Sequence, residues 1–303
     1  MESPTANFQV HAESPVHAMT LDVEDYFHVA AFNKVIGPDS WDQFELRVER
    51  NTEAFMELLD ERDVRATFFI LGWVADKVPH LIKRIAEHGH EIASHGYSHQ
   101  LIYRQTPAEF LAETDRSKKL LEDIVQQPIR GYRAASYSIT KDSLWALNII
   151  AEQGFEYDSS IYPIRHDNYG LLGGPETPYR IKLNNGAELL EFPITTAKLG
   201  KLTLPVGGGG YFRLYPYWVT QKLLNRRLAE TQAPFVFYLH PWELDPEQPK
   251  VAGAGALSRF RHYNNLHRVR DRLRLLLRDY GFTSMYNSLE QLPKSNLAVY
   301  SYT

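Results

Sequence analysis

The sequence predicts an α/β fold in which parallel β-strands alternate with α-helices. Two observations indicate this fold. Short apolar or β-branched runs alternate with amphipathic runs at the spacing of βαβ units, and charged or titratable side chains stand directly after four of the predicted strands. The alternation alone does not decide between an open sheet and a barrel. The length of 303 residues is compatible with one large α/β domain.

The first half of the chain provides the clearest elements. His17–Val23 is an apolar run that leads into acidic residues, and Arg65–Leu71 is rich in β-branched and aromatic side chains, so both are expected to be strands. Helical spacing of apolar residues predicts a helix at Glu49–Arg62. A second helix is expected at Pro79–His88, with proline near its start and Gly89 after its end.

The pattern continues with a short strand at Glu91–Ser94 and a long helix at Pro107–Val125. Thr106 is a good N-cap for that helix, and Pro107 suits its first position. A further strand and helix are expected at Pro128–Arg133 and Lys141–Gln153.

The second half is less regular. Asn185-Gly186 indicates a hairpin between short apolar runs, and Gly207–Gly210 indicates a flexible or closely approached loop. Phe235–Leu239 is a buried strand, and Asn264–Asp279 is a basic amphipathic helix that we expect to pack on the core. We therefore expect an extension at 1–16, one domain at 17–290 with an elaborated part from about residue 158, and a tail at 291–303.

Composition excludes several classes of protein. The net charge of −4 gives no basic footprint for nucleic acid, and the most apolar stretch, Ala66–Ala75, is far shorter than the roughly 20 residues of a membrane-spanning helix. The first 19 residues lack the basic and apolar regions of a secretory signal, and the chain has no cysteine. We expect a cytoplasmic protein, and a homo-oligomer is compatible with the sequence.

Residues able to carry chemistry gather after the predicted strands, where active sites of parallel α/β folds lie. The acids Asp22, Glu24 and Asp25 occur in the string LDVEDYFH at the end of the first strand, and Arg133 follows the fourth. Three acids so close together repel one another unless a cation lies nearby. Arginine pairing would depress the pKa of one acid and orient it, while another could ligate a metal or act as a general base.

A histidine pair provides the second half of a metal site. His95 and His99 are spaced i, i+4 in SHGYSHQ, so both imidazoles can face one ion. Two histidines and a carboxylate are a common catalytic metal set. His240, in FYLHPWE, is either a core histidine or an acid catalyst whose pKa is tuned by Trp242 and carboxylates.

Together these strings resemble the polysaccharide deacetylases of the NodB-homology group, carbohydrate esterase family four. HGYSH, DVEDYFH and YLHPWELDP carry the resemblance, which runs from about Met19 to about Phe282 and is nearest the peptidoglycan-deacetylase-like and allantoinase-like branch. GGGGYFRLYPY and FYLHPWELDPEQP further resemble deacetylases of exosortase-linked exopolysaccharide clusters. The resemblance implies a distorted (β/α) barrel with fewer than eight strands.

The resemblance also implies roles for individual residues. Asp22 would be the catalytic base, Arg133 would brace it, and His240 would be the general acid. His95 and His99 would bind a divalent metal with either Glu24 or Asp25, of which we slightly favour Asp25 because a shorter carboxylate after a turn suits a tight site. Zinc is the default ion, and Co, Ni or Mn would also suit these ligands.

Three departures from the family pattern stand out. Val23 separates acids that are adjacent in most members, Gly96 replaces Ser or Thr, and Ala135-Ser136 replaces a proline-bearing loop that lends an N–H to the oxyanion. The substrate implied is an N-acetylated glycan, from which metal-assisted hydrolysis would release acetate. Candidate substrate-binding residues lie in the same loops and in aromatic-rich segments: Ser136, Tyr137, Tyr162, Arg165, His166, Tyr169, Tyr211, Arg213 and Trp242. Two alternatives remain, an allantoinase-like cyclic amide or ureide hydrolase and a non-catalytic carbohydrate-binding protein.

Overall fold

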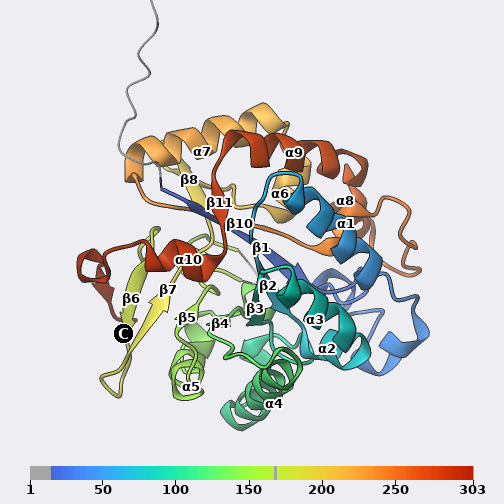
Figure 1. Ribbon diagram of the computed structural model, residues 1–303, viewed down its shortest axis with the longest axis horizontal. Helices are drawn as coiled ribbons and strands as arrows, with labels where there is room; N and C mark the ends of the chain where they lie inside the picture. Colours follow the sequence, from blue (N-terminus) through green and yellow to red (C-terminus); the bar gives the residue numbers. More distant parts are fainter. Residues whose placement is uncertain (1–14, 167–168, 303) are drawn as a thin grey trace, which may run out of the picture.

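The architecture is a mostly parallel β-sheet covered by helices on its outer face, as seen in a computed structural model that describes residues 15–166 and 169–302 (Figure 1). The strand order is β10-β1-β2-β3-β4-β5-β7-β6-β12, and β11 also pairs with β1. The strands are β1 (His17–Val23), β2 (Thr67–Ile70), β3 (Glu91–Ser94), β4 (Gly131–Tyr132), β5 (Tyr157–Asp158), β6 (Tyr179–Lys182), β7 (Glu188–Glu191), β10 (Val236–Leu239), β11 (Phe282–Thr283) and β12 (Val299–Tyr300). The fold class predicted from the sequence is confirmed.

Helices fill the connections between the parallel strands. Figure 1 shows α7 and α9 above the strands and α2, α3 and α4 below them. The α-helices are α1 (Val48–Asp60), α2 (Gly72–Lys77), α3 (Pro79–Glu87), α4 (Pro107–Val125), α5 (Ala146–Glu152), α6 (Gly209–Leu214), α7 (Tyr217–Thr231), α8 (Ala256–Tyr263), α9 (Val269–Asp279) and α10 (Met285–Glu290). Thr106 caps α4 through a complete capping box with Glu109.

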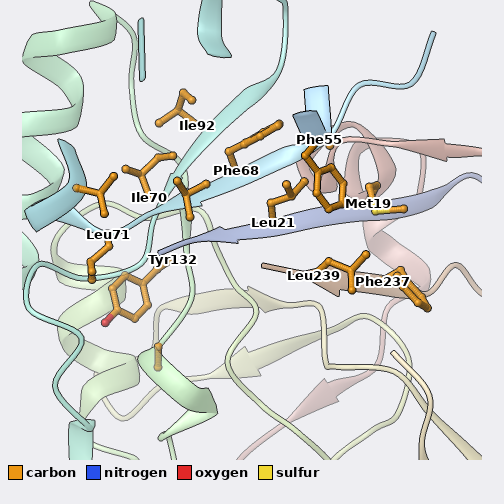
Figure 2. Packing of buried hydrophobic residues seen from close by; sticks show 14 of the residues in the cluster. Met19, Leu21, Phe55, Phe68, Ile70, Leu71, Ile92, Tyr132, Phe237 and Leu239 are labelled. Carbon is orange, nitrogen blue, oxygen red and sulfur yellow. The ribbon is translucent and has the colours of Figure 1, made fainter. Parts of the chain in front are cut away.

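The core has two layers because strand side chains alternate between the two faces of the sheet. Met19 and Leu21 of β1 point outward and pack with Phe55 of α1 between sheet and helices (Figure 2). Ala18 and the β10 residues Val236 and Tyr238 belong to a second apolar cluster on the inner face. All seven residues of β1 are buried, which accounts for its nearly continuous apolar character.

The segment that follows β7 approaches the free edge of β10 without forming a continuous ladder. The Thr195 hydroxyl donates to the carbonyl of Val236 at 2.6 Å and accepts from its N–H at 2.9 Å. Further along, Gly208 forms an isolated parallel bridge with Tyr238. Segment 192–208 therefore brings the chain alongside β10.

Several elements differ from the sequence predictions. The strand expected at 128–133 pairs only at β4, and the helix expected at 141–153 divides into a 3-10 turn (Lys141–Ser143) and α5. The basic helix begins as a 3-10 turn at Leu266–Arg268 and becomes α9, whose buried apolar side chains pack on the core as expected. The expected tail adds β12, which pairs in parallel with β6.

The other second-half predictions can be placed in the same way. Asn185-Gly186 turns the chain between the antiparallel strands β6 and β7, as predicted. A separate hairpin forms from β8 (Thr196–Leu199) and β9 (Leu202–Pro205). The glycine run at 207–210 passes from the bridge with Tyr238 into the start of α6, and a side chain at Gly208 would collide with the Tyr238 carbonyl. Among the described residues no helix is both long and apolar enough to cross a bilayer.

Candidate active site

The predicted strand ends converge at the carboxyl edge of the sheet. Asp22 lies near the end of β1, His95 follows β3, Arg133 follows β4, and His240 follows β10. β10, β1, β2, β3 and β4 are neighbours in one parallel sheet, so their carboxyl ends meet at one edge. All four side chains belong to one cluster, in which His240 Nε2 lies 4.0 Å from Asp22 Oδ2.

Glu24, His95 and His99 form the cluster most suited to a metal ion. Their ligand atoms all lie within 4.8 Å of one another, and all three residues are buried. His99 Nε2 lies 2.8 Å from Glu24 Oε2, an oxygen without another hydrogen-bond partner in the described structure. A buried carboxylate beside two imidazoles is a typical donor set for a catalytic divalent ion.

Neighbouring groups orient these three side chains. His95 Nδ1 lies 2.8 Å from the Arg133 carbonyl oxygen, which can only accept, so Nδ1 carries the proton and Nε2 keeps its lone pair. Burial, with Asp22 and Glu24 opposing it, lowers the pKa of His95 to about 4, which keeps the ring neutral at neutral pH. The Trp242 indole donates to Glu24 Oε1 at 3.2 Å and fixes the carboxylate.

The structure does not support the slight preference for Asp25 as the metal-binding acid. Asp25 Oδ2 accepts from the backbone N–H groups of Arg47 and Val48 at 2.6 and 2.8 Å, and Oδ1 accepts from Tyr26 N–H. Oδ2 thus holds the start of α1, and Oδ1 is engaged by the loop after β1. Burial raises the pKa of Asp25 to about 6 against these hydrogen bonds. The acid that faces the histidines is Glu24.

Asp22 is held by a fully buried arginine, the arrangement expected from the sequence. Arg133 donates through Nη1 to Asp22 Oδ1 at 2.7 Å and to the Thr20 hydroxyl at 2.8 Å. Its other nitrogens bond to the carbonyl and hydroxyl of Ser159. Burial would raise the pKa of Asp22, but the charges of Arg133, His95 and His240 hold it below the usual value. Asp22 is therefore ionised, with Oδ2 facing His240.

The loop after Arg133 has an unusual backbone. Ser136 and Tyr137 both have positive φ, of 51° and 54°, a conformation that L-residues adopt at a cost of about 1–3 kcal/mol each. The turn brings the Tyr137 hydroxyl to 3.4 Å from Asp22 Oδ2. Ala135, which replaces the usual proline, is buried at the start of the turn. The Tyr137 N–H already donates to the Ala134 carbonyl.

His240 belongs to a charge chain that sequence reasoning missed. Its Nδ1 lies 2.8 Å from Glu243 Oε1, and Glu243 Oε2 accepts from Arg213 Nε at 2.6 Å. Burial would lower the pKa of His240, but the hydrogen bond to Glu243 and the nearby Glu24 raise it to about 8. The signal was present in HPWE, because glutamate three residues after a turn-starting residue forms a capping box.

The residues predicted to contact substrate fall into two groups. Arg213 and Trp242 are buried: Arg213 binds Glu243 and the carbonyls of His262 and Asn264, and Trp242 stacks between His240 and His262. Both therefore support other side chains, and their prediction as substrate contacts is not supported. The glutamate that Arg213 binds, and the indole bond to Glu24, could not be read from residue types alone.

Other predicted contacts border the site. Tyr137 packs edge-on against Tyr162 and Tyr169, and His166 stacks on Tyr169 at 3.8 Å. Tyr211 bonds to Tyr169 and contacts Tyr215. Ser136 is half-buried in the positive-φ turn, and Arg165 is exposed. Tyr137 and Tyr162 are buried, so in this aromatic cluster next to Asp22 the half-buried Tyr169 is the ring that a sugar can reach.

Comparisons with known proteins agree with this geometry. Residues 38–157 match the family model described as polysaccharide deacetylase, and residues 159–290 match a domain of unknown function. A peptidoglycan-N-acetylglucosamine deacetylase of Bacillus cereus is 31% identical over 105 residues, which are 34% of this chain and 37% of that protein. A chitooligosaccharide deacetylase of a Bradyrhizobium species is 29% identical over 100 residues, 33% of this chain and 43% of that protein. The chain thus spans less than half the length of these two relatives.

Solved structures resemble the whole chain in fold. A Mycobacterium smegmatis protein provisionally assigned as a polysaccharide deacetylase superposes with a TM-score of 0.63 at 19% identity, covering 99% of this chain and 98% of that one. The PuuE allantoinase superposes with a TM-score of 0.57 at 13% identity, covering 96% and 97%. At these identities the likeness concerns the fold, and it extends through both halves of the chain.

Proposed function

We propose, from the membership of this chain in the polysaccharide deacetylase family (carbohydrate esterase family four), that it removes N-acetyl groups from amino sugars of a glycan. One observation carries the proposal. A carboxylate braced by arginine, a buried Glu-His-His cluster and a histidine paired with glutamate surround one point at the carboxyl edge of the sheet. These are the three parts that metal-assisted hydrolysis of an amide requires.

Glu24, His95 and His99 would hold the divalent ion. The fit rests on the fixed Nδ1–H of His95, the unpartnered Glu24 Oε2 and the close approach of the three donors. When bound, the ion would supply Lewis acidity that lowers the pKa of water and polarises the acetyl carbonyl. Zinc suits two imidazoles and one carboxylate, and Co, Ni and Mn are alternatives.

Asp22 and His240 would move the protons. Asp22, kept ionised by Arg133, would accept the proton of the attacking water at Oδ2, the oxygen that Arg133 leaves free. His240, with a pKa raised to about 8, is protonated at neutral pH and would donate its Nε2 proton to the leaving amine. Glu243 would keep Nδ1 of that ring protonated and stabilise its positive charge.

The substrate would be a polysaccharide or its precursor that contains N-acetylglucosamine. The two relatives named for deacetylation of peptidoglycan and chitooligosaccharide support this sugar, and the half-buried Tyr169, which packs beside Tyr137, supports a ring-stacking ligand. The backbone N–H of Ser136 is the proposed donor to the oxyanion, from a turn whose positive φ angles hold it in one conformation. A role in exopolysaccharide biosynthesis is part of the proposal.

The test combines metal content with acetate release from N-acetylglucosamine oligomers. We expect about one ion per chain, acetate release that a chelator abolishes and added metal restores, and loss of turnover in Asp22→Asn and His95→Ala. His80→Ala is the matched control, since His80 is exposed and pairs with Glu49 on α1. Full turnover in Asp22→Asn would contradict the assignment of the base. Hydrolysis of allantoin without acetate release would overturn the substrate.

A further inference from the structure

Large exposed apolar side chains gather on three connected segments beside the active site. They are Val35, which follows the 3-10 turn η1 (Ala30–Phe32), Leu214 and Trp218 at the corner between α6 and α7, and Leu257 and Phe260 on α8. Their exposed fractions range from 45% for Val35 to 66% for Trp218. Large apolar side chains this exposed are unusual when they occur as a group.

Direct contacts hold the three segments together. Arg213 donates to the carbonyls of His262 and Asn264, and the Asn265 amide donates to the Arg213 carbonyl, which joins the α6 corner to the end of α8. Phe32 packs on His262 at 4.8 Å, which joins η1 to α8. Figure 1 shows α6 and α8 next to one another, in agreement with these bonds.

Stacked rings connect this surface to the candidate active site. His262 of α8 stacks on Trp242 at 4.2 Å, and Trp242 stacks in turn on His240. α8 therefore lies close to the candidate active site.

The three segments carry positive charge only. Segments 30–36, 213–218 and 253–268 contain no aspartate or glutamate, although the chain has 37 acidic residues. Lys34, Arg259, Arg261 and Arg268 are exposed on these segments, and none of them pairs with a carboxylate in the described part of the chain. On α8 the apolar pair Leu257 and Phe260 lies between Arg259 and Arg261 around the helix.

We propose that this rim surface, made of Val35, Leu214, Trp218, Leu257 and Phe260 with Lys34, Arg259, Arg261 and Arg268, docks on an anionic lipid bilayer. The outward apolar side chains would enter the interfacial region, with the flanking cations at the headgroups, which is the composition of interfacial binding surfaces. An exposed tryptophan is well suited to that interface. Docking would turn the mouth of the site toward glycan attached to or lying on the membrane, a consequence that rests on the proposed function.

Sedimentation of the full chain with vesicles tests the docking without any use of activity. We expect binding to vesicles of equal parts phosphatidylglycerol and phosphatidylcholine and at least tenfold weaker binding to phosphatidylcholine alone. Leu257→Ser/Phe260→Ser should weaken binding at least tenfold. Arg259→Gln/Arg261→Gln should weaken it by about 30-fold, at roughly 1 kcal/mol for each cation near the surface. Both variants change exposed side chains, and circular dichroism verifies their folding.

Leu199→Ser/Leu202→Ser is the matched control. These leucines are 49% and 63% exposed on the β8–β9 hairpin. The residue before this hairpin, Thr195, bonds to Val236 at the start of β10, whereas His240 follows the end of β10. The hairpin therefore meets the sheet at the opposite end of β10 from His240. The control should bind vesicles within twofold of the unchanged protein. Absence of binding to anionic vesicles, or loss of binding in the hairpin variant alone, would overturn the proposal. The proposal would also be overturned if Leu257→Ser/Phe260→Ser bound vesicles like the unchanged protein while Arg259→Gln/Arg261→Gln lost binding. Charge alone would then account for the binding, as for a soluble polyanion.

Discussion

Replacing Arg213 with methionine should destabilise the protein while leaving substrate affinity nearly unchanged. The Arg213 guanidinium is 3% exposed and pairs at 2.6 Å with Glu243, whose side chain is 0% exposed. Methionine fills a similar volume but leaves the glutamate with only His240 and the His240 N–H as hydrogen-bonding partners. The substitution also removes the Arg213 hydrogen bonds to the carbonyls of His262 and Asn264.

The expected size follows from burial of the unpaired charge. Removing one partner of a buried ion pair costs about 3–5 kcal/mol, a third or more of the stability of many domains. With an unfolding entropy of about 2.1 cal/mol/K per residue over this chain, the melting temperature should fall by about 5–8 °C. Arg213→Met/Glu243→Gln removes the stranded charge as well, so it should recover at least half of the lost free energy.

Urea unfolding followed by circular dichroism measures the stability, and acetate-release kinetics measure KM and kcat. We expect kcat to fall because His240 loses the charge chain that holds it, and KM to stay within twofold. A melting temperature within 2 °C of the unchanged protein together with a KM raised tenfold would refute this reasoning. That result would instead restore Arg213 as a residue that contacts substrate, as the sequence alone predicted.

Four other substitutions test buried groups. Asp25→Ala should lose about 2–4 kcal/mol by freeing three backbone N–H groups yet retain one metal ion per chain by elemental analysis, whereas Glu24→Ala should lose the ion. His17 is buried against Phe235 with its pKa lowered to about 3, so its contribution to stability is complete above pH 6.5 and is lost as the pH falls toward 3. Urea unfolding of His17→Phe should therefore depend less on pH across that range, and an unchanged slope would contradict the assignment. Burial raises the pKa of Asp158 to about 6, so above that pH the buried, ionised Asp158 lowers the stability of the folded state. Asp158→Asn should be about 1–2 kcal/mol more stable at pH 8 and show no gain near pH 4, and a loss at pH 8 would argue against a buried charge.

The sequence predicted the first half of the molecule well because its signals are local. Apolar runs bounded by turns mark β1, β2 and β3, and the side chains after them are fixed at the carboxyl edge by the parallel topology alone. Asp22, His95 and Arg133 follow directly from that rule. The i, i+4 spacing of the histidines predicted that they share a metal site, and they do lie together, although residues 95–99 form no helical turn and Gly96 and His99 have positive φ.

The choice between Glu24 and Asp25 could not be made from local signals. It depends on which way the chain turns after β1, where the Glu24 N–H donates to the Asp22 carbonyl. It also depends on α1, which begins 23 residues after Asp25 and whose first N–H groups donate hydrogen bonds to the Asp25 carboxylate. Side-chain length alone favoured Asp25 as the metal ligand. That preference failed because the backbone N–H groups at the start of α1 bind the Asp25 carboxylate instead.

The prediction of Arg213 as a substrate contact also failed because its partners are distant in the sequence. Its partners Glu243, His262 and Asn264 are 30 to 51 residues away, and no periodicity connects them. Exposed arginines in glycine- and tyrosine-rich loops commonly reach ligands, but this one is buried where three segments meet. The length of α6, only six residues, hid the fact that it is packed against the core.

The strand order explains why neither half of the chain can form the site alone. β1 lies between β2 and β10, so the strand that carries Asp22 needs a neighbour from residues 236–239 as well as one from residues 67–70. The segment that matches the polysaccharide deacetylase model, 38–157, contains neither β1 nor β10. It holds His95, His99 and Arg133, whereas His240 and Glu243 come from 159–290. The proposed base, metal ligands and general acid are thus brought together only when the chain returns to the first strand, so residues of both halves are needed to build the proposed site.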